Sequence, residues 1–328
     1  MLITIVIPVW QRAKQLSLIL KKLDEQASYL FEKLEVLLCD SHSAEEIDLL
    51  VIDANEKLSS LTIKHVHTQN IVAAKRNLGI KSASGDFLVF IDDDCIPADN
   101  FLESILALTS EYDKNKIYCG EVRFEKELVI NSNYYRYRDS RHPHYVKEHK
   151  KSLNAWTFVS MNCLISKDVL VRTGILYNEK FLGYGCEDHE FPWNLLKKNV
   201  TIELAEQLIY HHEYNGDVLK YSNKIKSTAR DGMYVLAHEC PELILSNKKL
   251  CKLEKLFKKN NIAGTLLSKT IFSPILSSLV ARILIKVDKI SFFYMPVLFR
   301  YVLFCAYVQG INERESIDRK KLLKEWYL

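Results

Sequence analysis

The sequence predicts an α/β fold with a mostly parallel central sheet flanked by helices. Short apolar runs rich in β-branched residues alternate with helical stripes along the first part of the chain, as βαβ units do. Several of these runs end in a proline or a carboxylate, which is typical of strand ends that face a ligand. Beyond residue 245 the alternation stops, and we expect a mainly helical appendage over residues 246–328.

The expected elements follow one another in a regular order. Strands are predicted at 2–9, 34–39, 62–67, 87–91, 117–125, 156–165 and 201–209. Helices are predicted at 11–25, 44–58, 71–82, 101–108 and 167–172. The polar segment 131–151, rich in Tyr, Arg and His, is predicted to be a long loop.

The composition narrows the class of protein. A hydrophobic content of 48% is ample for a core, and a net charge of +4 gives no reason to expect nucleic acid as a partner. The eight cysteines form no CxxC pair, so neither a zinc site nor a disulfide framework is predicted. The first residues resemble a core strand and not a signal peptide, and no uncharged apolar stretch reaches the roughly 18 residues of a membrane span. We therefore expect a cytoplasmic protein.

Three consecutive carboxylates, Asp92, Asp93 and Asp94, follow the apolar run 87–91. Unpaired carboxylates at the end of a buried strand are costly, so the pattern favours a bound cation. Oxygen ligands suit Mg2+ or Mn2+, and such an ion commonly also holds a phosphate. A solvated acidic turn is the alternative interpretation.

Two further strand ends carry Pro8 and Asp40, and parallel strands bring their carboxyl ends to one edge of the sheet. The chain has neither GxGxxG nor GxxxxGK[ST]. A phosphate at this edge would therefore be held by a metal ion and basic side chains.

A second informative stretch is FLGYGCEDHEF, residues 181–191. Its glycines allow a tight loop, and Glu187 and Asp188 open a helix. Acids in a first helical turn favour the helix dipole, but one of them is also placed to act as a general base. His211 and His212 follow the strand 201–209 and are either metal ligands or neutral core histidines.

Residues 248–310 are basic and apolar, with helical patterning. This composition suits the surface of an anionic membrane, where lysines contact headgroups. The alternative is a helical subdomain that packs on the sheet or on a partner chain, and we favour the membrane surface.

Four stretches together resemble the inverting nucleotide-sugar glycosyltransferases of family 2, which have the GT-A fold. They are ITIVIPVWQR, LLCDSHS, AAKRNLGIKSASGDFLVFIDDDCIP and FLGYGCEDHEF, in family order over about the first 215 residues. The last of them is most similar to bacterial chondroitin-type and galactosyl- or N-acetylgalactosaminyl-transferases. The resemblance implies a GT-A domain over residues 1–245, with a nucleotide-binding half (1–100) and an acceptor half (101–245).

The resemblance also implies roles for individual residues. Pro8 and Arg12 would line the nucleotide pocket, Asp40 would contact uracil, and Arg76 and Asn77 would face the ribose and diphosphate. Asp92 and Asp94 match the DxD pair, with Asp93 between them in the nucleotide-sugar site. Asp94 would bind the metal with His211, or with His212 as the alternate, while Asp188 would be the base and Glu187 would lie beside it for the acceptor. Ser41 and His42 depart from the family's Asp-Gly at this point.

The implied activity is inverting, Mn2+- or Mg2+-dependent transfer of a Gal, GalNAc, GlcNAc or Glc-type sugar. The donor is a UDP-sugar, and the acceptor is a hydroxyl of a saccharide or lipid-linked saccharide in capsule or O-antigen synthesis. Such an enzyme is expected at the inner face of the cytoplasmic membrane. One alternative is a sugar nucleotidyltransferase, a class that has a glycine-rich N-terminal loop, but the segment PVWQRAKQ lacks the glycines. The other alternative is a non-catalytic nucleotide-binding scaffold.

Overall fold

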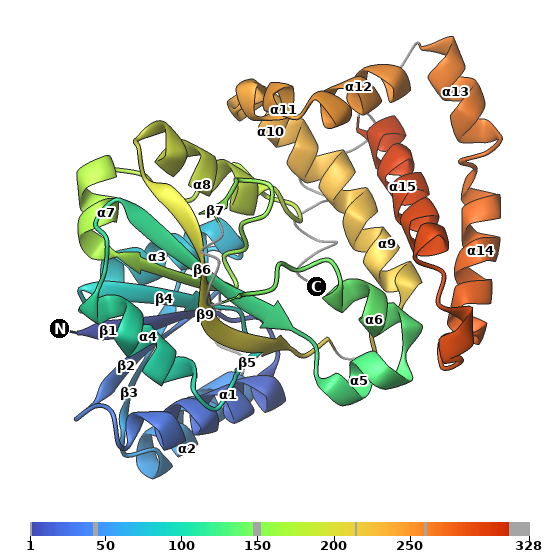
Figure 1. The fold of residues 1–328 in the computed structure, drawn as a ribbon. Helices are drawn as coiled ribbons and strands as arrows, with labels where there is room; N and C mark the ends of the chain where they lie inside the picture. Colours follow the sequence, from blue (N-terminus) through green and yellow to red (C-terminus); the bar gives the residue numbers. More distant parts are fainter. Residues whose placement is uncertain (1, 42–44, 147–151, 214, 259–260, 315–328) are drawn as a thin grey trace. The chain divides into compact units, whose positions relative to one another are not determined.

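A computed structural model describes residues 2–41, 45–146, 152–213, 215–258 and 261–314 (Figure 1). These residues form two compact units, which we describe separately. The first unit comprises residues 1–125, 142–179 and 191–213. The second comprises residues 126–141, 180–190 and 214–328.

The first unit is built on the alternation that the sequence predicts. Its parallel strands lie in the order β3-β2-β1-β4. Their bounds are β1 (Ile3–Pro8), β2 (Leu34–Asp40), β3 (Leu61–His67) and β4 (Phe87–Ile91). The connecting helices are α1 (Ala13–Ala27), α2 (Glu45–Lys57) and α3 (Val72–Ser82). Helices α1 and α2 lie on one face of these strands and α3 on the other, because the chain reverses direction across the sheet after β3 (Figure 1).

The other half of the sheet mixes strand directions. β8 (Asn162–Ser166) runs antiparallel to β4, β6 (Lys116–Arg123) runs antiparallel to β8, and β9 (Thr201–His211) runs parallel to β6. The short strands β5 (Cys95–Pro97) and β7 (Ser152–Leu153) both pair with β9. Helices α4 (Phe101–Ser110) and α7 (Lys167–Thr173) also belong to this unit. The mostly parallel sheet between helices confirms the predicted fold class.

The core lies on both faces of the central strands. All six residues of β1 and all seven of β2 are buried, as continuous apolar strands require. Helix α3 approaches β1 so closely that a Cβ at Gly79 would lie 2.2 Å from Val6 Cγ1. This contact packs the second half of α3 on β1, while Lys75, nearer the start of α3, donates to the Val9 carbonyl just beyond β1.

Two local predictions are wrong. The segment predicted as a loop at 131–151 contains α6 (Asn133–Asp139), preceded by α5 (Lys126–Asn131). Ser132 caps α6, and Arg138 lies over the ring of Tyr221 at 3.7 Å. These contacts stabilise a helix that its polar sequence does not indicate. The strand predicted at 156–165 begins only at Asn162, because the preceding residues turn on Asn154, which accepts a hydrogen bond from the Trp156 amide.

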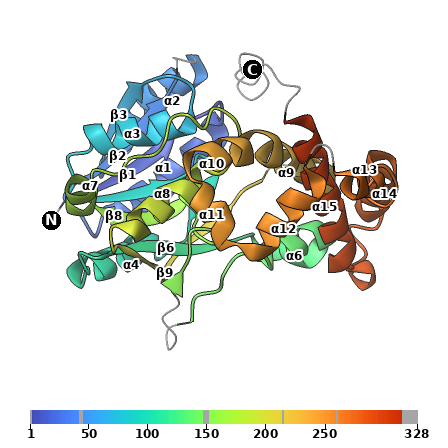
Figure 2. The same cartoon turned by 90° about the horizontal axis from the view of Figure 1, so that it is seen from above.

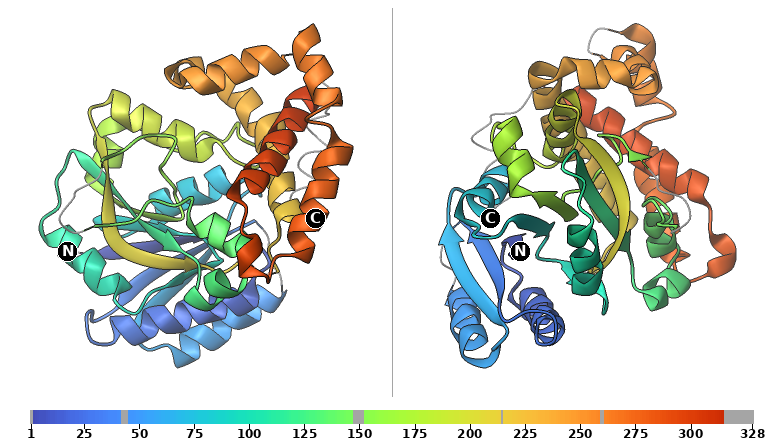
Figure 3. Two further views of the ribbon diagram at one scale, coloured as in Figure 1. Left: turned by 45° about the vertical axis from the view of Figure 1, so that its right-hand side comes forward. Right: turned by 60° about the vertical axis from the view of Figure 1, so that its left-hand side comes forward.

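The second unit is mainly helical, as the appendage was predicted to be. Its long helix α15 (Pro296–Glu313) lies beside α9 (Val218–Ser227) and α14 (Pro274–Lys286) (Figures 2 and 3). The other α-helices after α9 are α10 (Met233–Glu239), α11 (Pro241–Ser246), α12 (Lys248–Phe257) and α13 (Ile262–Lys269). A π-helical turn, η1 (Thr228–Gly232), follows α9, and a 3-10 turn, η2 (Ser291–Phe293), precedes α15. Phe257, Val308 and Ile311 form a small core, and Glu254 pairs with Arg314.

Among the described helices, none is long and apolar enough to cross a membrane by itself. Helices α13 and α14, which meet at a 42° bend, reach the required length and composition only when they are taken together.

Candidate active site

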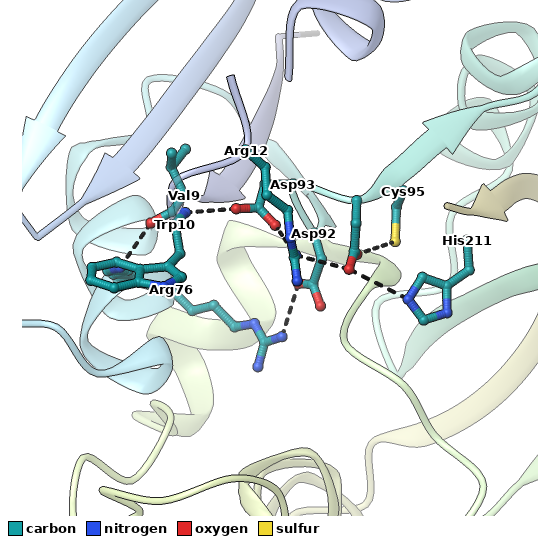
Figure 4. A network of polar contacts seen from close by, with 10 residues as sticks. Val9, Trp10, Arg12, Arg76, Asp92, Asp93, Cys95 and His211 are labelled. Carbon is teal, nitrogen blue, oxygen red and sulfur yellow. Dashed lines mark hydrogen bonds and ion pairs between the residues drawn. The ribbon is translucent and has the colours of Figure 1, made fainter. Parts of the chain in front are cut away.

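The acid triplet lies at the end of β4, where its three carboxylates have different surroundings (Figure 4). The side chain of Asp92 is 28% exposed, while those of Asp93 and Asp94 are almost fully buried. Asp92 accepts a hydrogen bond from Arg76 at 3.1 Å. The solvated-turn interpretation therefore does not fit Asp93 and Asp94.

Asp93 ties the start of α1 to the end of β4. Its carboxylate accepts hydrogen bonds from the Trp10 amide at 2.6 Å and from the Arg12 guanidinium at 2.5 Å. Burial raises the pKa of Asp93 to about 7, with Arg12 opposing the shift and Asp94 adding to it. Asp93 therefore holds the loop that carries Arg12, which the sequence placed in the nucleotide pocket.

Asp94 and His211 meet although they come from distant parts of the sequence. Asp94 Oδ2 lies 3.5 Å from His211 Nε2, and strands β5 and β9 pair Cys95 with His211. The Arg12 guanidinium lies 2.8 Å from the same Asp94 oxygen. His212 donates its backbone amide to the Asp94 carbonyl at 2.7 Å. The structure thus brings the side chain of His211, the first of the two predicted histidines, to the Asp94 carboxylate.

The start of α3 places Arg76 and Asn77 at the same edge of the sheet. Arg76 is buried, and its guanidinium lies 5.2 Å from the ring centre of Tyr177. The Asn77 side chain accepts a hydrogen bond from the Tyr177 amide and donates to the Tyr177 carbonyl and to Glu179, each at 2.9 Å. Asn77 therefore positions the segment that carries Tyr177 against Arg76.

Asp40, at the end of β2, is buried among basic groups. Its carboxylate lies 3.5 Å from His65 Nε2 and 4.0 Å from Lys75 Nζ. Burial by itself would raise the pKa of Asp40, but the neighbouring His65, a hydrogen bond from the Ser41 amide and the Lys75 charge lower it below its usual value. Pro8 lies on the neighbouring strand, paired with Cys39. His42 lies outside the described residues.

The sequence prediction missed Lys75 and His65. The Lys75 ammonium is buried and donates to the Val9 carbonyl and to Asn70, each at 2.8 Å, and burial lowers its pKa to about 8. The position of Lys75 directly before Arg76 in the sequence was the signal that could have identified it as a site residue. Nothing local in the sequence marks His65 as a neighbour of Asp40, because the two residues meet only through the pairing of β2 with β3.

Glu187 and Asp188 open α8 (Glu187–Lys197) and belong to the second unit. The preceding glycines form the tight loop that was predicted, with Gly185 at φ 86° and Cys186 at φ 77°. A Cβ at Gly232 would lie 2.4 Å from the Gly185 carbonyl oxygen, so this loop packs on η1. Glu187 is buried and Asp188 is partly exposed.

The geometry combines buried carboxylates, a histidine and three buried or half-buried cations at the carboxyl ends of parallel strands. Such an arrangement suits an anionic ligand and a divalent cation. Residues 4–174, more than half of the chain, match the family described as glycosyl transferase family 2. The chain belongs to this family, which confirms the resemblance found in the sequence.

Two chondroitin synthases, both much longer than this chain, are among its curated relatives. The chondroitin synthase of Escherichia coli is 26% identical over 247 residues, which cover 65% of this chain and 35% of that protein. The chondroitin synthase of Pasteurella multocida is also 26% identical over 247 residues, covering 65% of this chain and 25% of that protein. The chain therefore spans between a quarter and about a third of these relatives.

Solved structures share the fold. TarS 1-349 of S. aureus in complex with UDP-GlcNAc has a TM-score of 0.51 at 13% identity, covering 96% of this chain and 92% of that chain. The mannosyltransferase PcManGT of Pyrobaculum calidifontis in complex with GDP-Man and Mn2+ has a TM-score of 0.52 at 13% identity, covering 95% of this chain and 87% of that chain.

Proposed function

We propose that this chain is an inverting glycosyltransferase that moves a hexosyl or N-acetylhexosaminyl unit from a UDP-sugar to a saccharide hydroxyl. The observation that carries the proposal is the pairing of Asp94 with His211 beside Arg12, in a chain of glycosyl transferase family 2. The names of the relatives, chondroitin synthases and a UDP-GlcNAc complex, support a UDP-sugar as the donor. We place the reaction in bacterial capsule or O-antigen synthesis.

The nucleotide is proposed to bind across residues 1–100, with the acceptor in 101–245. The Asp40 carboxylate would accept a hydrogen bond from the N–H group of uracil. Its lowered pKa keeps this carboxylate ionised. Pro8 would contribute the wall of the base pocket. Arg76 would face the diphosphate and Asp92 the ribose, while Asn77 acts by holding Tyr177 in place. A diphosphate needs such cations because burying its charge unpaired is costly.

A divalent cation, Mn2+ or Mg2+, fits between Asp94 and His211. The 3.5 Å between Asp94 Oδ2 and His211 Nε2 is close to the spacing of two ligands on one ion, and both side chains are largely buried. When bound, the ion would supply a Lewis acid for the leaving diphosphate. Arg12 shares the same Asp94 oxygen, so it would move toward the phosphates as the ion binds.

Asp188 is proposed to take the proton from the acceptor hydroxyl, with Glu187 binding the acceptor. Direct displacement at the anomeric carbon requires one base and no nucleophile of the protein, and it inverts the configuration at that carbon. The tight packing of the Gly185 loop on η1 would hold the start of α8, and with it the Asp188 side chain, in a fixed orientation.

The proposal is tested by incubating the full chain with Mn2+, a panel of UDP-sugars and saccharide acceptors, and following sugar transfer by mass spectrometry. We expect transfer with one UDP-sugar and an inverted anomeric centre in the product. Binding of UDP without transfer or donor hydrolysis for any sugar would favour the scaffold alternative. Release of diphosphate from a sugar phosphate and UTP would favour the nucleotidyltransferase alternative.

We also propose that the second unit touches the inner face of the cytoplasmic membrane. Exposed apolar side chains gather on α13, α14 and the turns next to them, and the largest exposures are those of Ile262, Leu266, Ile275, Leu279 and Phe292. Exposed basic residues accompany them, namely Lys269, Arg282, Lys286 and Lys289. Apolar side chains with adjacent cations match an interface of acyl chains and anionic headgroups.

Co-sedimentation with vesicles tests this contact. The wild-type chain should sediment with anionic phosphatidylglycerol vesicles and much less with neutral phosphatidylcholine vesicles. Ile275→Asp combined with Leu279→Asp should abolish sedimentation. The matched control is Val171→Asp, because Val171 is 75% exposed but lies on α7 of the first unit. Equal sedimentation of wild type and the double variant would contradict the proposal.

A further inference from the structure

A second potential metal site lies at the edge strand of the first unit, away from the acid triplet in the sequence. His65 and His67 belong to β3, which ends the strand order of the sheet, and Asp48 lies in the first turn of α2. One ligand atom from each of the three residues lies within 4.8 Å of the others. Among the described residues, these three form a cluster of two imidazoles and one carboxylate.

The pattern of β3 explains why the two histidines point the same way. Side chains alternate between the faces of a strand, so Leu61, Ile63, His65 and His67 share one face. Leu61 and Ile63 are buried, and toward the end of β3 the same face carries the two imidazoles, with Asp48 of α2 beside His65. Two imidazoles in place of apolar side chains at this end of the face, next to a carboxylate, point to a polar role.

The distances suit a transition metal. His65 Nδ1 lies 3.2 Å from Asp48 Oδ1. In a tetrahedral site with bonds of about 2.0–2.1 Å, ligand atoms lie roughly 3.3 Å apart. The rings of His65 and His67 are 4.3 Å apart between centroids, and His67 is exposed, so it can turn to complete the set.

The other nitrogen of His65 supplies an independent observation. His65 Nε2 lies 3.5 Å from Asp40 Oδ2, and both side chains are more than nine-tenths buried. Histidines that bind a metal through one ring nitrogen commonly donate the other N–H to a carboxylate, which fixes the tautomer and the ring orientation. His65 Nε2 makes no hydrogen bond with a described residue, and Asp40 is a carboxylate near enough to accept one when a metal ion holds the ring from the Asp48 side.

We propose that Asp48, His65 and His67 bind one first-row transition metal ion of the Zn2+ class, with the fourth position open to water. Two imidazoles and one carboxylate favour such an ion over Mg2+ or Ca2+, which prefer oxygen ligands. The ion would join the first turn of α2 to β3. It would also hold His65 against Asp40, so this site would stiffen the edge of the sheet that carries Asp40. The proposal does not depend on the proposed transferase activity.

The test uses the full chain after chelator dialysis, with Zn2+ measured by calorimetry and elemental analysis and Co2+ followed by its visible absorption. Beyond any ion held by Asp94 and His211, we expect one Zn2+ per chain at this site, an intense tetrahedral Co2+ band, and a higher thermal unfolding midpoint with Zn2+. His67→Ala and Asp48→Asn should lose all three effects. Both positions are partly or fully exposed, so these variants should fold, which their unfolding midpoints without metal will verify.

Three controls separate this site from others. His238→Ala removes an exposed histidine of α10, and Asp53→Asn removes an exposed acid of α2; both should bind Zn2+ like the wild type. Asp94→Asn should also keep the Zn2+. Absence of Zn2+ binding in Asp94→Asn, or the same number of bound Zn2+ ions in the wild type as in His67→Ala and Asp48→Asn, would overturn the proposal. Loss of Zn2+ binding in Asp94→Asn but not in the triad variants would assign the ion to the acid triplet.

Discussion

Asp94 Oδ2 lies 3.5 Å from Nε2 of His211, and Arg12 lies 2.8 Å from the same oxygen. The pairing of β5 with β9 brings this histidine to the acid triplet. The contact joins the two halves of the sheet at the point where a cation and a diphosphate would bind.

The first prediction concerns this pair. Asp94→Asn and His211→Gln should each lose most of the gain in UDP affinity that Mn2+ gives the wild type, because each removes one protein ligand of the ion. His212→Gln should keep that gain, since the described contact between His212 and Asp94 uses the backbone amide. Calorimetric titration of UDP with and without Mn2+ measures the effect. An unchanged gain in UDP affinity in Asp94→Asn would show that the metal does not bind at this position.

The second prediction separates catalysis from helix stability at Asp188. Asp188→Asn should lower the rate of sugar transfer by roughly 10²–10⁴-fold while leaving UDP affinity unchanged, as loss of a general base does. If Asp188 served only the helix dipole, the variant would lose about 0.3–1 kcal/mol of stability and keep its activity. Asp168→Asn, which removes an exposed first-turn acid of α7, is the matched control and should transfer sugar at the wild-type rate.

The third prediction concerns the pH dependence of stability through Glu35. This buried carboxylate of β2 accepts hydrogen bonds from Lys64 at 2.6 Å, Thr4 at 2.5 Å and the Ser84 amide at 2.8 Å. Burial by itself would raise its pKa, but these donors lower the pKa from 4.5 to about 2. A carboxyl whose pKa is lowered on folding stabilises the protein above its unfolded pKa, and it loses that contribution as the pH falls from 4.5 toward 2.

Glu35→Gln should therefore cost about 1–3 kcal/mol in the free energy of unfolding near neutral pH, a range that allows for screening at half-exposed Lys64. The difference from the wild type should shrink as the pH falls below 4.5. Urea unfolding at a series of pH values measures it. A difference that stays constant with pH would show that the charge of Glu35 is not what stabilises the fold.

The fourth prediction tests the packing of the second unit. A Cβ at Gly310 of α15 would lie 2.2 Å from the Lys226 carbonyl oxygen in α9. Gly310→Ala should therefore push the two helices apart and cost about 1–3 kcal/mol in the free energy of unfolding. Val297→Ala, at a position of α15 that is 69% exposed, is the control and should change stability little. Denaturant unfolding measures both variants, and an unchanged free energy of unfolding in Gly310→Ala would contradict the prediction.

Much of the first unit follows from local sequence. The strands β1 to β4 and the helices between them were predicted within a few residues, because buried parallel strands and amphipathic helices leave clear periodic patterns. The helix predicted at 167–172 is also confirmed as α7, which Ser166 caps and which ends at Gly174. Helix α6 was missed, since tertiary contacts of Tyr and Arg side chains stabilise it and its own sequence does not mark it.

The candidate site was predictable in its residue types and less so in its arrangement. The acid triplet and His211 were identified from motifs, and the structure brings them together. Sequence alone did not show that Asp93 binds the Trp10 amide, that Asn77 clamps Tyr177, or that His65 lies between Asp48 and Asp40. Each of these contacts depends on strand register or on a turn, which motif spacing does not encode. The roles of Glu187 and Asp188, and the division into nucleotide and acceptor halves, stay predictions.

The most direct test of the central claim is calorimetric binding of UDP to the wild-type chain, with and without Mn2+, beside GDP, CDP and dTDP. The account predicts binding that is selective for UDP and markedly tighter with Mn2+, because Asp40 reads the base and Asp94 with His211 holds the ion. Failure of all four nucleotides to show Mn2+-dependent binding would contradict it.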